Sequence, residues 1–455
     1  MIPKVTVYMP NFNYSMYIEQ AVNSIINQTL SDWELIIIDD GSQDNSLKLL
    51  EKYKIDNRIT IISQENKGLN VTNNVAIRLA RGEYIVRVDS DDYLEENFLL
   101  ILANMLDSNP KIGLAFPDYH NVDKDGNILE TIRRKKIGVE SELLDLPAHG
   151  ACTMFRLDIL KNIGSYNEEF SCQDGFDIWL RFIEKHQPGN VNLPLFYYRQ
   201  HNASLTKNEQ KILDTRRAIN RKYVDNKGGI KNKLACFIPI QTKSIYHQNR
   251  PFVELAGKPL IWYTLSEAIK IKCFDEIIVS CSDEEVLKYV NKNFPNIKAL
   301  KRKFDDDRNE LSMPFLIKNS LKELDSLHLQ DNDAVCMLPI STPLRKAKHI
   351  EHAIDAMEIF DVDTVISIEE EFSPCYNHGK FGLKPINIKS QLEHRLERDS
   401  IFRDNSAILL SKIKQINLGE MIGKKVGHIT MLPEESIKLN SDFEFFIAEK
   451  ILNSQ

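Results

Sequence analysis

The chain has 455 residues, of which 42% are hydrophobic and 27% charged, and its net charge is −7. This length favours two or three domains, and the composition is that of a soluble globular protein. The acidic balance indicates no nucleic-acid partner, and no apolar run approaches the roughly 18 residues of a membrane-spanning helix. The first residues enter a strand pattern directly, so we expect no signal peptide.

The seven cysteines are odd in number and scattered, and several lie in apolar, strand-like runs. No two of them form a Cys-x-x-Cys pair. This pattern predicts reduced core residues in a cytoplasmic protein, without disulfides and without a structural zinc site.

Short apolar strands alternate with helices along the first part of the chain. The expected elements, in order, are strand 5–9, a helix carrying Ile18, Ala21, Val22 and Ile25, strand 34–38, helix 47–53, strand 59–62, a helix carrying Val71, Val75 and Leu79, and strand 85–88. The run 34–38 is continuously apolar, as in a strand buried on both faces. This alternation predicts a parallel sheet with right-handed crossovers.

Polar side chains follow three of these strands, at residues 10–13, 39–42 and 89–92. The carboxyl ends of parallel strands face one crevice, so we expect the three clusters to form one site. Carboxylates there suit Mg²⁺ or Mn²⁺, the cations that hold phosphates. Taken alone, Asp-x-Asp is also typical of a solvated acidic turn.

The residue types in these clusters favour a nucleotide diphosphate bound with a cation. Phe12 could stack on a base, and Asp40 could accept from a base N–H. Asp89 and Asp91 could hold the ribose and the metal. The phosphate-cradling patterns GxxxxGK[ST] and GxGxxG are absent, so the cation must supply most of the charge neutralisation.

Residues 4 to about 205 resemble the family 2 glycosyltransferases, inverting enzymes with the GT-A fold. The matching motifs are VYMPNFN (7–13), Gln28-Thr29, ELIIIDDGSQD (34–44), NKG (66–68), GEYI (82–85) and DSDD (89–92). The resemblance implies a nucleotide-sugar donor, most often a UDP-sugar in this family, held by Pro10, Phe12, Asn13, Asp40, Lys67, Asn74, Asp89 and Ser90. It places Asp91 on Mn²⁺ or Mg²⁺. Asn73 departs from the family, because many members carry arginine there.

The reaction also needs a general base for the acceptor hydroxyl. Family members keep it in a Glu-Asp or Gln-Asp pair before an Asp-aliphatic-Trp-aliphatic helix, and residues 171–181 read SCQDGFDIWLR. The resemblance implies that Asp174 is this base, while Asp177 suits a helix N-cap or first turn. His201, in the family's Tyr-Arg-x-His ending, is either a ligand of the metal or diphosphate or an ordinary hydrogen-bonding residue. His149 is either an acceptor-side residue or a hydrogen-bonded loop residue.

A basic segment follows the first domain. Residues 207–233 hold nine Lys or Arg against three acids, and Gly228-Gly229 lies near the end. We expect a helix over 207–224. Such a helix is typical either of peripheral contact with the inner face of a membrane or a lipid-linked acceptor, or of a solvated face, and both alternatives stay open. The predicted domains are 1–206, a helical linker 207–232, and 233–455.

Strands and helices alternate again in the second half. The expected strands are 234–238, 276–280, 334–338, 364–368 and 407–410. Two expected helices carry Ile261, Leu265, Ala268 and Ile269, and Ile350, Ala353, Ile354 and Met357. This predicts a second α/β sandwich, and hence two Rossmann-like α/β domains in tandem.

Residues 233–455 resemble the CMP-sialic-acid synthetase (acylneuraminate cytidylyltransferase) family. The matching motifs are LAGKPLI (255–261), FDEIIVS (274–280), STPLR (341–345), NSAI (405–408) and PEES (433–436). Active-site positions of that family hold other residue types here: Gln241, Ile245, Arg250, Pro251, Ser282, Pro339 and Lys438-Leu439-Asn440.

Joining CTP to an acidic sugar brings polyanions together, and cations must neutralise them. Lys438 replaces a metal-binding carboxylate and would repel a divalent ion, while Ile245 supplies no charge. We therefore expect this half to be catalytically inactive. Because active relatives are often dimers, we also expect homo-oligomers formed through it.

Three hypotheses follow. The first is a cytoplasmic, metal-dependent, inverting glycosyltransferase with an inactive cytidylyltransferase-like domain, which adds a sugar to a glycan or lipid-linked acceptor in surface polysaccharide or glycoconjugate synthesis. The second is a bifunctional enzyme that also makes a CMP-sugar. The third is a non-catalytic nucleotide-sugar-binding scaffold, against which the set Asp40, Asp89, Asp91 and Asp174 argues.

Overall fold

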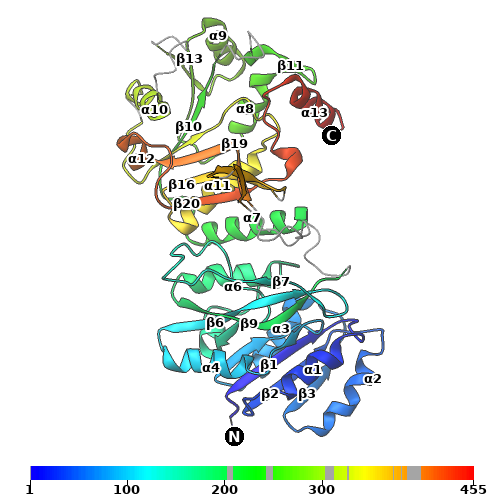
Figure 1. The fold of residues 1–455 in the computed structure, drawn as a ribbon. Helices are drawn as coiled ribbons and strands as arrows, with labels where there is room; N and C mark the ends of the chain where they lie inside the picture. Colours follow the sequence, from blue (N-terminus) through cyan, green and yellow to red (C-terminus); the bar gives the residue numbers. More distant parts are fainter. Residues whose placement is uncertain are drawn as a thin grey trace. The chain divides into compact units, whose positions relative to one another are not determined.

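The computed structural model describes residues 2–201, 209–241, 250–302, 312–324, 327–371, 373–380, 382–386 and 401–454. Ile245 lies outside the described residues. The chain forms two compact units, Met1–Arg216 and Arg217–Gln455, and the division falls within helix α7 (Glu209–Asn226). Each unit has its own central sheet with flanking helices (Figure 1), so the predicted tandem α/β class is confirmed.

The sheet of the first unit has the strand order β3-β2-β1-β4-β8-β6-β9-β5, with β7 paired to β6. Its strands are β1 (Val5–Asn11), β2 (Trp33–Asp39), β3 (Ile59–Ser63), β4 (Tyr84–Arg87), β5 (Tyr93–Leu94), β6 (Ile112–Val122), β7 (Ile128–Ile132), β8 (Met154–Arg156) and β9 (Gln187–Arg199). Strands β1 to β4 are parallel, as predicted. Beyond β4 the sheet is mixed, because β8 inserts antiparallel to both β4 and β6.

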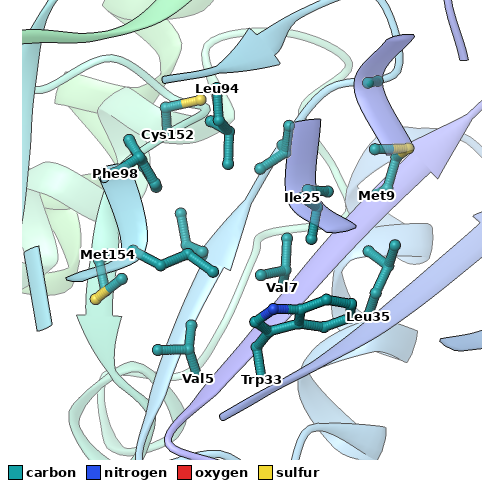
Figure 2. Packing of buried hydrophobic residues seen from close by; sticks show 14 of the residues in the cluster. Val5, Val7, Met9, Ile25, Trp33, Leu35, Leu94, Phe98, Cys152 and Met154 are labelled. Carbon is teal, nitrogen blue, oxygen red and sulfur yellow. The ribbon is translucent and has the colours of Figure 1, made fainter. Parts of the chain in front are cut away.

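The helices of the first unit cover the faces of this sheet. They are α1 (Ile18–Ile26), α2 (Ser46–Leu50), α3 (Leu69–Leu79), α4 (Phe98–Ser108), α5 (Leu157–Asn162) and α6 (Asp174–Ile183), with a 3-10 turn at Glu51–Ile55. The predicted apolar face of α1 is buried in full. Figure 2 shows part of the core, where Val5, Val7 and Met9 of β1 pack with neighbouring strands and α1. Each such side chain stabilises the fold by about 1.5–3 kcal/mol, which fixes the strand ends that carry the site.

Helix α3 buries a different face from the predicted one. Leu79 is exposed, whereas Asn70, Asn73 and Asn74 are buried. The Asn70 amide nitrogen donates to the carbonyls of Asn167 and Phe170, at 2.8 and 2.7 Å. A polar face is buried here because it binds the backbone of a loop, so the prediction from apolar spacing was wrong for this helix.

The second unit has a seven-stranded sheet in the order β14-β13-β10-β15-β19-β16-β20. Its strands are β10 (Leu234–Pro239), β13 (Glu276–Cys281), β14 (Lys298–Lys301), β15 (Ala334–Met337), β16 (Thr364–Glu371), β19 (Ile401–Lys412) and β20 (Val426–Thr430). The two small hairpins are β11 (Glu254–Leu255) with β12 (Lys258–Pro259) and β17 (Tyr376–Gly379) with β18 (Gly382–Pro385). Strand β19 runs antiparallel to both neighbours.

The helices of the second unit include both predicted ones. They are α8 (Leu260–Ala268), α9 (Glu284–Asn293), α10 (Met313–Lys322), α11 (Ala347–Phe360), α12 (Ile413–Leu418) and α13 (Asp442–Asn453). The predicted apolar face of α11 is buried. Ile269, expected on the apolar face of α8, is instead exposed, because the helix ends at Ala268.

All seven cysteines are free, in agreement with the sequence. None of the helices in the described ranges is long and apolar enough to cross a membrane.

Candidate active site

Hydrogen bonds join the three polar clusters at the carboxyl ends of β1, β2 and β4. The amide nitrogen of Asn11 donates to Asp39 Oδ1 at 2.7 Å. The hydroxyl of Ser90 donates to the carbonyl of Pro10 at 2.8 Å. The structure therefore brings the three predicted clusters to one edge of the sheet, as the parallel order of these strands requires.

Asp40 is buried and is held largely by the chain itself. Its carboxylate accepts from the backbone nitrogens of Lys67 and Gly68, at 2.9 and 2.8 Å, and from the side chain of Gln64 at 2.7 Å. A carboxylate offers about four acceptor positions, so about one remains for a ligand. The side chain of Phe12 is 45% exposed and is available for stacking.

Asn13 and Asn74 also make internal contacts. Asn13 has a positive φ of 61° and its side-chain oxygen accepts from the Gln43 backbone. The amide of Asn74 is engaged with residues 166–168: Nδ2 donates to the Tyr166 carbonyl at 2.9 Å and Oδ1 accepts from its N–H at 2.9 Å. Asn74 thus fixes the loop that precedes α6, and its predicted contact with the donor stays a prediction.

Asp91 and His201 form a pair although they are far apart in sequence. His201 Nε2 lies 2.8 Å from Asp91 Oδ2, and the His201 ring contacts the rings of Tyr14 and Tyr17, at centroid distances of 5.7 and 5.8 Å. Burial, reinforced by Asp91, raises the pKa of Tyr14 well above its usual value. The structure therefore places the two predicted metal ligands side by side.

The other acids of the DSDD motif differ in exposure: the side chain of Asp89 is 27% exposed, and Asp92 is buried. Burial raises the pKa of Asp89 to about 6; Arg87 opposes this shift, and Asp91 and Asp174 add to it. Burial also raises the pKa of Asp92 well above its usual value. Asp92 Oδ1 accepts from the backbone N–H of Arg199 at 2.9 Å, while its Oδ2 has no hydrogen-bond partner among the described residues.

Arg199, at the end of β9, fixes the loop that carries Asp91. This fully buried guanidinium donates to the Asp91 carbonyl at 2.9 Å, to the Lys124 carbonyl at 2.9 Å and to Gln20 Oε1 at 2.7 Å. The end of β9 is thereby tied to the loop after β4, so His201 stays next to Asp91.

Asp174 begins helix α6, directly after Gln173, which has a left-handed backbone with φ 58°. Two glycines allow the first turn of α6 to approach the loop before β8. A Cβ on Gly175 would lie 2.8 Å from the Gly150 Cα atom. This close approach sets Asp174 against Arg87, whose Nη1 donates to Asp174 Oδ2.

Arg87 is the last residue of β4 and was not among the predicted site residues. Its charge within an otherwise apolar strand was a usable signal. Its Nε lies 2.9 Å from Asp89 Oδ1. One guanidinium therefore pairs with both Asp89 and Asp174, which places the predicted base and the DSDD motif in the same site.

The donor set fits a hard divalent cation. No group of three acidic, His or Cys side chains arranged to hold a metal occurs in the ranges that the structure describes. Mg²⁺ is usually bound through one or two carboxylates together with substrate phosphates and water, so Asp91 supplies a suitable ligand, whereas the imidazole of His201 suits softer divalent cations better. Asp91 and Asp174 add to the raised pKa of Asp89, and a bound cation would stabilise the ionised form of that carboxyl.

His149 behaves as a hydrogen-bonded loop residue. Its Nδ1 lies 3.2 Å from the Ala151 N–H, and its ring contacts that of Tyr198 at 4.5 Å. Burial lowers the pKa of His149 to about 4, so the imidazole is neutral near pH 7.

The first half of α7 contacts the segment that carries Asp174. Arg216 Nε donates to Gln173 Oε1 at 2.7 Å, and its guanidinium lies 5.3 Å from the Phe176 ring centroid. Cys172 Sγ donates to Thr215 Oγ1 at 3.1 Å. Arg216, one of the basic residues of segment 207–233, is therefore bound to other residues of the first unit.

In the second unit, two of the positions that depart from the cytidylyltransferase pattern, Lys438 and Arg250, make internal contacts. Lys438 Nζ donates to Ser406 Oγ at 3.1 Å, and Arg250 Nη2 donates to the carbonyl of Leu439 at 2.6 Å. The buried Asn405 amide donates to Ser436 at 2.9 Å. Residues of the NSAI and PEES motifs thus meet in the fold, and the exposed Lys438 contacts one of them.

Two family models match the chain. Residues 6–164 match the model described as glycosyl transferase family 2, and residues 235–374 match the model described as cytidylyltransferase. These matches confirm the resemblance that the motifs indicated in each half, and with it the predicted fold class.

Curated relatives match part of this chain, and the match covers only part of their own length. Chondroitin synthase of Escherichia coli is 32% identical over 184 residues, which are 40% of this chain and 27% of that protein. Hyaluronan synthase of Pasteurella multocida is 35% identical over 185 residues, which are 40% of this chain and 19% of that protein. The matched region thus spans about a quarter or less of these relatives.

A solved structure of S. aureus TarS 1-349 is 15% identical and covers 86% of this chain and 98% of that chain, with a TM-score of 0.42. At this identity and TM-score, nothing about ligands is inferred for this chain from that structure.

Proposed function

We propose that this chain, which joins a family 2 glycosyltransferase domain to a cytidylyltransferase domain, transfers a sugar from a nucleotide-diphosphate donor to an acceptor hydroxyl. The proposed donor is a UDP-sugar, which is commonest in the family, and the reaction inverts the anomeric centre. The relatives named as chondroitin and hyaluronan synthases support a glycan acceptor. The product would belong to a surface polysaccharide or another glycoconjugate.

The donor would lie along the ends of β1, β2 and β4. Exposed Phe12 stacks on the base, and the remaining acceptor position of Asp40 takes a base N–H. Asp89, whose side chain is 27% exposed, accepts from the ribose. Ser90 holds Pro10 at 2.8 Å and so keeps the wall of this site in place. The side chain of Lys67 is exposed and free to reach the diphosphate.

Asp91 and His201 would hold Mn²⁺ or Mg²⁺. When bound, the cation supplies Lewis-acid stabilisation of the negative charge on the departing diphosphate. Tyr14 and Tyr17 fix the ring of His201 for this purpose.

Asp174 would act as the general base. The acceptor oxygen bonds to the anomeric carbon while the bond from that carbon to the diphosphate oxygen breaks, and Asp174 Oδ2 or Oδ1 takes the hydroxyl proton. The attack comes from the side opposite the leaving group, so the configuration inverts. The proposed donor-binding carboxylate, Asp89, and the proposed base, Asp174, both pair with Arg87.

The main support for this proposal is that Asp89 and Asp174 both form ion pairs with Arg87 and so belong to the same site. The test is transfer from a panel of nucleotide sugars to short glycans with Mn²⁺, using wild type, Asp91→Ala, Asp174→Asn and the exposed loop control Asp125→Asn. We expect transfer by wild type and Asp125→Asn, and a loss on the order of 100-fold or more in the other two. A folded wild type that neither transfers nor hydrolyses any donor would instead support the scaffold hypothesis.

We propose further that the second domain makes no CMP-sugar. Lys438, hydrogen-bonded to Ser406, puts a positive charge where a metal-binding carboxylate is needed. The full chain, incubated with CTP, an acidic sugar and Mg²⁺, should release no pyrophosphate above the level seen without sugar. Robust release would establish the bifunctional alternative.

Three expectations from the sequence stay predictions: homo-oligomers formed through residues 233–455, a cytoplasmic location, and peripheral contact of the basic helix with anionic lipid. Light scattering of the full chain tests the first. Co-sedimentation with vesicles containing anionic lipid, against neutral vesicles as the control, tests the last.

A further inference from the structure

Arg87 occupies an unusual position for a cation. It is the last residue of β4, where Ile85 and Val86 are fully buried, and its own side chain is only 6% exposed. Burying a guanidinium is costly unless it is paired, and a well-packed apolar residue is often at least as stabilising. The fold alone therefore does not account for an arginine here.

The pairing of Arg87 is two-sided. Nε lies 2.9 Å from Asp89 Oδ1 as an ion pair without hydrogen-bond geometry, and Nη2 donates to Asp89 Oδ2 at 3.4 Å, while Nη1 donates to Asp174 Oδ2. The planar guanidinium holds its nitrogens at fixed spacing, so it also fixes the spacing of the two carboxylates it binds. A lysine ammonium has no such fork.

The surroundings of Arg87 restrict its movement. The hydroxyls of Tyr8 and Tyr166 are 3.1 Å apart, both tyrosines are buried, and both interact electrostatically with the guanidinium. On another side, a Cβ at Gly150 would lie 3.2 Å from Nη2. The guanidinium is thus enclosed, and its hydrogen bond to Asp174 Oδ2 holds that carboxylate against it.

We propose that Arg87 is a positioning residue, which sets the Asp174 carboxylate at a fixed place relative to the donor-side carboxylate Asp89. This proposal rests on the proposed function. Asp89 contacts the donor and Asp174 the acceptor hydroxyl, so the guanidinium between them aligns the two substrates without touching either. Misplacement of a reacting group by about 1 Å can cost on the order of 100-fold in rate.

A double-mutant cycle tests the proposal. Steady-state transfer and Mn²⁺-dependent UDP binding are measured for wild type, Arg87→Lys, Arg87→Met, Asp174→Asn and Arg87→Met/Asp174→Asn, each with its melting temperature. We expect Arg87→Lys and Arg87→Met to lower kcat by on the order of 100-fold. Arg87→Lys keeps the buried positive charge, so it remains informative if Arg87→Met does not fold.

The double variant gives the decisive comparison. If Arg87 acts through Asp174, the double variant is no more than about threefold slower than Asp174→Asn, because residues acting as a unit are not additive. Losses that multiply, or Arg87→Lys with wild-type kcat, would overturn the proposal. Full activity of Asp174→Asn would overturn the proposed function itself, a result distinct from either of these.

Discussion

The contact between Gly150 and Gly175 gives a sharp test of how the base is placed. In Gly175→Ala, the new Cβ would lie 2.8 Å from the Gly150 Cα and 3.4 Å from its nitrogen. Ordinary contacts begin near 3.4 Å, so backbone must move by at least several tenths of an ångström, and Asp174 is the adjacent residue. Alanine is otherwise about 0.5–1 kcal/mol better than glycine inside a helix, so propensity alone predicts stabilisation.

We expect Gly175→Ala to lose about 1–3 kcal/mol of unfolding free energy by overpacking, and to lower kcat by on the order of 10- to 100-fold through displacement of Asp174. Gly150→Ala is the matched comparison. Its Cβ would lie 3.8 Å from the Gly175 Cα, which is an ordinary contact, and 3.2 Å from Arg87 Nη2, so a shift of only a few tenths of an ångström is needed. The effect on kcat should therefore be smaller.

Thermal unfolding and steady-state transfer, measured on both variants and wild type, check this prediction. A Gly175→Ala protein that melts higher than wild type and transfers at the wild-type rate would refute the close packing of α6 against the loop before β8.

Three further predictions follow from other contacts. Arg216→Ala removes the 2.7 Å bond to Gln173 and should lower kcat by about three- to tenfold; an unchanged kcat, with exposed Arg78→Ala as the control, would contradict this. Burial raises the pKa of Asp355 to about 7, despite its ion pair with Arg221. The folded state then binds the extra proton between about pH 4 and 7, so stability falls as pH rises through this window, by about 2–4 kcal/mol. Asp355→Asn should raise the melting temperature more at pH 8 than at pH 5, and an equal shift at both would be inconsistent with the titration. Removal of divalent ions by EDTA should abolish transfer and Mn²⁺ should restore it; activity persisting in EDTA would rule out the metal.

Much of the site could be predicted because it depends on local patterns. The parallel order of β1 to β4 follows from the alternation of strands and helices, and it brings residues 10–13, 39–42 and 89–92 together. The pairing of Asp91 with His201 required the family resemblance, because 110 residues separate them in sequence.

Other features could not be predicted from the spacing of residues in the sequence. Helix α3 buries asparagines because a distant loop supplies carbonyls to them, and apolar periodicity carries no signal of such a partner. Arg87 pairs with Asp174 only because two glycines, 25 residues apart, let backbone segments approach closely. The antiparallel insertion of β8 is likewise set by tertiary pairing on both of its edges.

The most direct measurement of the central claim is made on Asp174→Asn. Mn²⁺-dependent UDP binding by calorimetry and sugar transfer are compared with those of wild type. The account predicts UDP affinity within about threefold of wild type and a loss of transfer on the order of 100- to 10,000-fold. Transfer at the wild-type rate by the folded variant would contradict it.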